Sequence, residues 1–116
     1  MRVLLDNCVN QRFAKLLSGH EVIHARRKGW AELSNGNLMK AAEEDGFDVL
    51  LTVGKSIRMQ KKKADWVNTL ITLDAYSIIL EDLLPFLADI EIASRDLKAS
   101  GKKGEDLLLQ LPKPKG

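Results

Sequence analysis

The feature of this sequence that most constrains its fold is a set of short apolar runs separated by stretches with helical spacing. The run Asp48–Thr52 is almost entirely apolar, which is typical of a parallel strand covered by helices on both faces. Comparable runs occur at Arg2–Asp6, Glu21–Ala25 and Val67–Leu73. Because parallel strands need crossover connections, the pattern predicts a three-layer α/β domain with a mainly parallel sheet. We expect the strands to lie in the order second, first, third, fourth.

The segments between these runs carry the helical signals. Asn10 and Ser34 are suitable N-caps, and Gly46 is a suitable helix stop. Helices are therefore predicted over Asn10–Leu17, Ser34–Asp45 and Ser77–Lys98, with an interruption near Pro85. A last edge strand is predicted within Gly104–Leu111, and the Pro/Lys/Gly residues 112–116 are predicted to form a flexible tail.

Composition limits the classes of protein to which the chain can belong. Its 116 residues suffice for one domain, predicted over residues 1–111, and a net charge of +2 does not by itself indicate nucleic-acid binding. Cys8 is the only cysteine, so no intrachain disulfide can form. No leader pattern and no long apolar run is present, which predicts a cytoplasmic protein without a membrane span.

Asp6 is the first candidate for a functional residue. It follows three apolar residues and is expected at the carboxyl end of the first strand. Ligands of open α/β sheets bind beyond the carboxyl ends of the strands. Asp6 could also simply cap the next segment, as polar residues at strand ends often do.

Several separated motifs occur in an order that resembles the short PIN-like proteins. They are Leu-Leu-Asp-Asn at 4–7, Gly-His-Glu-Val-Ile at 19–23, Gly-Trp-Ala-Glu-Leu-Ser at 29–34 and Gly-Phe-Asp-Val-Leu-Leu-Thr at 46–52. This family is a compact prokaryotic branch of the PIN nuclease superfamily, often regarded as toxin components of toxin–antitoxin pairs. The resemblance covers Met1 to Leu73 and implies a PIN-like topology.

The resemblance implies a metal-dependent ribonuclease in which carboxylates at neighbouring strand ends hold Mg²⁺ or Mn²⁺. Asp6 matches the family's first acidic residue, the catalytic and metal-binding position. The other acidic positions are lost. Asn7 stands where relatives often have Glu, Ser34-Asn35-Gly36-Asn37 replaces Ser-Asp-x-Glu, and Thr52-Val53-Gly54 replaces Thr-x-Asp.

What remains is a predicted pocket around Asp6, formed by Asn7, Asn35, Asn37, Thr52 and Gly54. Amide oxygens can contact a metal, but they carry no charge and cannot act as general bases. We therefore expect a weak or inactive nuclease, which uses Mg²⁺ or Mn²⁺ if active and no cofactor if degenerate. Each asparagine also has an ordinary interpretation as a turn or cap residue.

A basic run follows the third strand and suggests a different function. No acidic residue interrupts it, and such a run can supply phosphate contacts to RNA. Its cations are Lys55, Arg58, Lys61, Lys62 and Lys63. The alternative function is accordingly a noncatalytic nucleic-acid- or protein-binding module. The expected partners are RNA, an antitoxin-like protein bound through the leucine-rich late helix, or a second copy of the chain.

Overall fold

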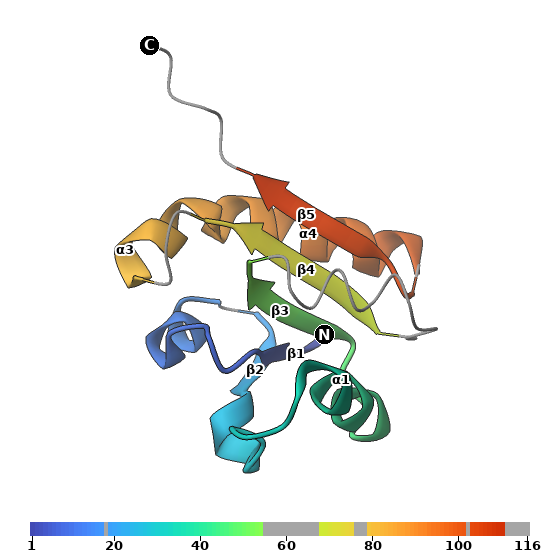
Figure 1. Cartoon of the computed structure of the whole chain (residues 1–116). Coiled ribbons are helices and arrows are strands. Elements are labelled where there is room, and N and C mark those ends of the chain that lie inside the picture. Colours follow the sequence, from blue (N-terminus) through green and yellow to red (C-terminus); the bar gives the residue numbers. More distant parts are fainter. Residues whose placement is uncertain (18, 55–67, 76–78, 102, 111–116) are drawn as a thin grey trace.

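A five-stranded sheet, parallel throughout, forms the centre of the molecule (Figure 1). The structure is a computed structural model that describes residues 1–17, 19–54, 68–75, 79–101 and 103–110. The strands lie in the order β2-β1-β3-β4-β5. Their bounds are β1 (Arg2–Leu5), β2 (Glu21–His24), β3 (Val49–Val53), β4 (Thr69–Asp74) and β5 (Asp106–Gln110). The predicted α/β fold and the order of the first four strands are confirmed.

One predicted helix differs in type from the prediction, and the predicted interruption near Pro85 is confirmed. The helices are η1 (Gln11–Leu16), η2 (Ala25–Lys28), α1 (Asn35–Glu44), α3 (Leu80–Leu83), η3 (Leu84–Phe86) and α4 (Leu87–Ser100). The first predicted helix is a 3-10 helix, and the predicted long helix is divided at η3, which contains Pro85. Proline lacks a backbone N–H and is tolerated only where a helix begins, so α4 starts anew after it.

The two predicted N-caps are confirmed. The Asn10 side chain accepts a hydrogen bond from the backbone N–H of Arg12, at 2.9 Å, at the start of η1. Ser34 Oγ accepts one from the N–H of Asn37, at 3.3 Å, at the start of α1. Each cap satisfies a donor that the helix itself leaves unpaired.

One face of the sheet packs against η2 and α1. Leu4, Leu50 and Leu70 come from three neighbouring strands, are fully buried, and share a cluster with Leu38 and Met39 of α1. Side chains alternate between the faces of a strand, so these residues occupy every second position. This cluster covers the amino-terminal part of the face.

The opposite face packs against η1, α3, η3 and α4. Leu5, Leu51 and Ile71 project to this side and share a cluster with Phe86 and Ile90. Helical elements therefore lie on both faces of the sheet, as the almost continuous apolar character of β3 predicts.

The last strand is confirmed but shorter than Gly104–Leu111, and it pairs in parallel with β4. The predicted tail at 112–116 lies outside the described residues. Among the described helices, none has the length and apolar character needed to cross a membrane.

Candidate functional site

Asp6 directly follows β1, at the carboxyl-end edge of the sheet, and its side chain is buried. Its Oδ2 accepts hydrogen bonds from Thr52 Oγ1 at 2.7 Å and from Cys8 Sγ at 3.4 Å. Its Oδ1 accepts one from the backbone N–H of Asn7 at 2.7 Å. Both carboxylate oxygens are therefore engaged by donors of the chain itself.

The backbone N–H and carbonyl of Asp6 are also hydrogen-bonded. Its N–H donates to the carbonyl of Leu51 at 2.9 Å, which extends the pairing of β1 with β3. Its carbonyl accepts from the N–H of Val9 at 2.9 Å, which closes a turn immediately after the strand. The chain therefore turns away from the sheet directly after Asp6, and Asp6 itself remains at the carboxyl-end edge of the sheet.

Register places Asp6 in a polar row across three strands. Leu5 pairs with Leu51, and Thr52 pairs with Thr72, so Asp6, Thr52 and Thr72 follow one another across β1, β3 and β4. Thr72 is fully buried, and its hydroxyl has no hydrogen-bond partner among the described residues. The face of the sheet that packs against α1 is therefore apolar near the amino ends of the strands and polar near their carboxyl ends.

Of the predicted pocket residues, Asn7 and Thr52 are brought to Asp6. The Asn7 side-chain Nδ2 donates to the carbonyl of Trp30 at 3.1 Å, and its Oδ1 is buried without a partner in the described part of the chain. Asn7 thereby links the turn after β1 to the segment that precedes α1.

The other predicted pocket residues have local structural roles. Asn35 and Asn37 lie in the first turn of α1, and within the described residues neither side chain hydrogen-bonds to Asp6. Gly54 has φ +87° and donates its N–H to the carbonyl of Leu73 at 3.2 Å. This backbone conformation is strained for any other residue, so an aspartate is disfavoured at position 54.

The described residues around Asp6 do not fit a divalent metal ion. No group of three or more His, Cys, Asp or Glu side chains in the described part of the chain could hold one. The side-chain partners of Asp6 are a hydroxyl and a thiol, which contribute no negative charge to offset the cost of dehydrating Mg²⁺ or Mn²⁺.

Asp74, at the end of β4, has a different hydrogen-bond partner from those of Asp6. Its Oδ2 accepts a hydrogen bond from Gln110 Nε2 at 3.0 Å on the neighbouring strand. The N-cap position of α3 is Ile79, so Asp74 does not cap that helix. The predicted nucleic-acid contacts at Lys55, Arg58 and 61–63 lie outside the described residues.

His24 is a site residue whose role the sequence does not reveal. It is buried at the end of β2, and its Nδ1 accepts from the N–H of Arg26 at 3.1 Å. The ring proton is therefore on Nε2, which donates to the carbonyl of Val9 at 2.7 Å. Because both ring nitrogens are used in these hydrogen bonds, His24 has a structural role in joining β2 to the turn after β1.

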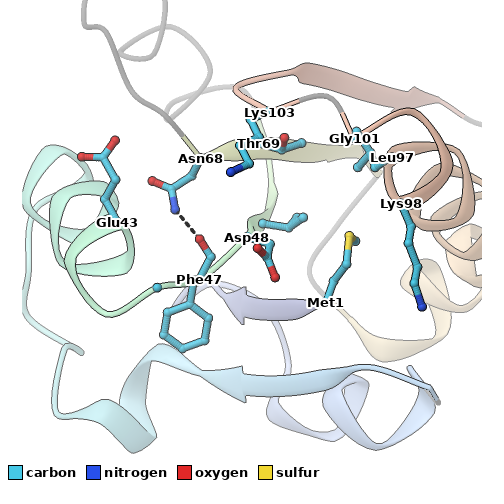
Figure 2. Close-up of a pocket in the computed structure, with 12 residues that line it drawn as sticks. Met1, Glu43, Phe47, Asp48, Asn68, Thr69, Leu97, Lys98, Gly101 and Lys103 are labelled. Carbon is cyan, nitrogen blue, oxygen red and sulfur yellow. Dashed lines mark hydrogen bonds between the residues drawn. The ribbon is translucent and has the colours of Figure 1, made fainter.

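A cavity of about 440 Å³ lies at the opposite, amino-terminal edge of the sheet (Figure 2). Glu43 of α1 and Lys98 of α4 flank it from different sides, as Figure 2 shows. Asn68 lines it, donates from Nδ2 to the carbonyl of Phe47 at 2.6 Å, and has a buried Oδ1 that no described residue pairs. No sequence motif indicated this cavity, because its walls come from segments that only the fold brings together.

The Cys8 thiol should be unreactive at neutral pH. Burial raises the pKa of this thiol above its usual range, and the negative charge of Asp6 raises it further. At pH 8, we expect iodoacetamide to alkylate the Cys8 thiol more slowly than it alkylates the thiol of free glutathione. An Asp6→Asn variant should shift the pH midpoint of thiolate absorbance downward, because one negative charge is removed. An unchanged midpoint in the variant would contradict the Asp6–Cys8 contact.

No family model matches the chain, and no curated protein or solved structure shows significant similarity to it.

Proposed function

We propose that this protein is a PIN-like domain of the toxin–antitoxin nuclease type whose acidic site is too depleted to cut RNA efficiently. The observation that carries the proposal is the environment of Asp6. Its carboxylate accepts from Thr52, Cys8 and Asn7, and no cluster of metal-binding side chains exists within the described residues. Metal-assisted cleavage needs several anionic ligands to activate water and stabilise the leaving oxygen.

The function that remains is binding of RNA in the cytoplasm through the basic run that follows β3. Support comes from the sequence, where five cations occur between Lys55 and Lys63 without an intervening acidic residue. Phosphate contacts of this kind supply most nonspecific affinity and are sensitive to salt. An antitoxin-like protein is the further partner that the family resemblance implies.

The enzyme hypothesis is tested by incubating the protein with single-stranded RNA and Mn²⁺, beside an Asp6→Asn variant. We expect neither protein to release product faster than RNA alone, because one hydrogen-bonded carboxylate holds a metal ion poorly. Metal-dependent cleavage that disappears in the variant would show that Asp6 is catalytic and would overturn the proposal.

The binding hypothesis is tested by replacing Lys61, Lys62 and Lys63 with Glu. We expect RNA affinity to fall, and the slope of log affinity against log salt to decrease by about 0.7 for each phosphate that is no longer neutralised. The matched control replaces three exposed cations elsewhere, Arg12, Lys15 and Lys40, and changes net charge equally. Equal decreases in affinity in the two triple variants would show that general charge, and not this segment, determines binding.

A further inference from the structure

We propose that the groove between α4 and β5 binds an extended basic segment of another protein, which adds to the sheet beside β5. The groove has a volume of about 790 Å³ and is formed by one side of α4 and the length of β5. This inference does not depend on RNA binding, because the groove and the basic run are different parts of the chain.

Incomplete burial of β5 is the first observation. Leu107, Leu108 and Leu109 are all half-buried, whereas the leucines of the central strands are fully buried. Ile92 on α4 is 54% exposed and lies beside them in the groove. The exposed apolar surface of the groove is therefore formed by several neighbouring side chains and not by a single one.

The backbone of β5 is the second observation. In the described part of the sheet β5 has one neighbour, β4, and forms its edge (Figure 1). Leu70 N–H donates to the carbonyl of Glu105 at 2.8 Å. Successive residues of a strand turn their backbone groups to opposite sides, so Leu107 and Leu109 face β4 and Leu108 faces outward. Such an edge is a template for another strand.

The negative charge of the groove indicates the kind of segment that binds there. Four carboxylates line the groove, from Asp89, Asp96, Glu105 and Asp106, and no Lys or Arg is among its described lining residues. A second copy pairing through the same edge would bring two sets of these acids together. In a segment in which Lys or Arg alternates with apolar residues, the basic side chains would lie on one face of the added strand, toward the acids of α4, and the apolar side chains on the other face.

The test uses the peptide Lys-Val-Lys-Val-Lys-Val-Lys and the intact protein. We expect binding by fluorescence polarisation, together with slower hydrogen exchange of the Leu108 amide. A peptide N-methylated at the central valine and at the lysine after it keeps its charge and loses one backbone donor on each edge, so one lost donor faces β5 in either register, and we expect it to bind about tenfold more weakly. Equal affinity of the two peptides, or no binding of either, would overturn strand addition.

Charge recognition is tested with an Asp89→Asn, Asp96→Asn double variant. We expect weaker peptide binding and a smaller salt dependence. The control is Glu32→Gln with Glu44→Gln, which changes net charge equally at exposed positions outside the groove. Equal effects of both pairs would overturn the assignment to the groove. Dimerisation of the free protein with protection of Leu108 would overturn the choice of a basic partner in favour of a second copy.

Discussion

Phe86→Ala should lower the free energy of unfolding by about 3–5 kcal/mol, the cost of deleting a large buried aromatic side chain. Phe86 is fully buried in η3, the turn that joins α3 to α4. It belongs to the cluster that contains Leu83, Ile90 and the inward residues of the central strands. Removing the ring leaves a cavity between this turn and the sheet. Urea denaturation of the two proteins measures the difference.

Leu84→Ala is the matched control, because Leu84 lies in the same turn but is 41% exposed. We expect it to change the free energy of unfolding by only about 0.5 kcal/mol. If the two variants were equally stable, η3 could not be packed on the sheet through Phe86. That result would also question the position of α4, which forms one wall of the groove proposed above.

Asp6→Ala should lower the free energy of unfolding by about 3 kcal/mol, at the upper end of the cost of unsatisfied buried donors. The change removes the acceptor for the Thr52 hydroxyl, which is buried, and for the N–H of Asn7. It leaves these donors beside an apolar methyl group. Thermal and urea denaturation measure the loss.

Asp74→Ala is the control for a carboxylate at a strand end. Asp74 accepts a hydrogen bond from Gln110 in an exposed position, so its loss should cost about 0.5 kcal/mol. The comparison also bears on function. Residues kept for catalysis commonly reduce stability, so removing them is often neutral or stabilising. A neutral or stabilising Asp6→Ala would contradict a structural role for Asp6 and would favour an active site.

The sequence correctly predicted features that depend on local patterns. The apolar run of β3 identified a strand covered on both faces, and the side chains of Asn10 and Ser34 identified two helix starts. Pro85 located the break in the late helical region. Each of these signals acts over a few residues, through burial, capping or a missing N–H, so each can be read without knowing which segments are neighbours.

The resemblance to PIN-like proteins implies an aspartate at the position of Gly54, and the sequence by itself gives no physical reason for the glycine. The structure shows a backbone with φ +87° there. The sequence alone records a missing carboxylate. The backbone conformation adds that another residue at this point would be strained.

The sequence by itself determined the class of fold, the strand order and the position of Asp6 at the edge of the sheet. Only the tertiary structure decided what Asp6 contacts, because Thr52 is 46 residues away and reaches it through the register of β1 and β3. The same is true of the groove beside β5, whose walls come from two separate elements. Local sequence sets which residues form a strand, whereas long-range pairing sets which side chains meet and which of the described strands lies at the edge of the sheet.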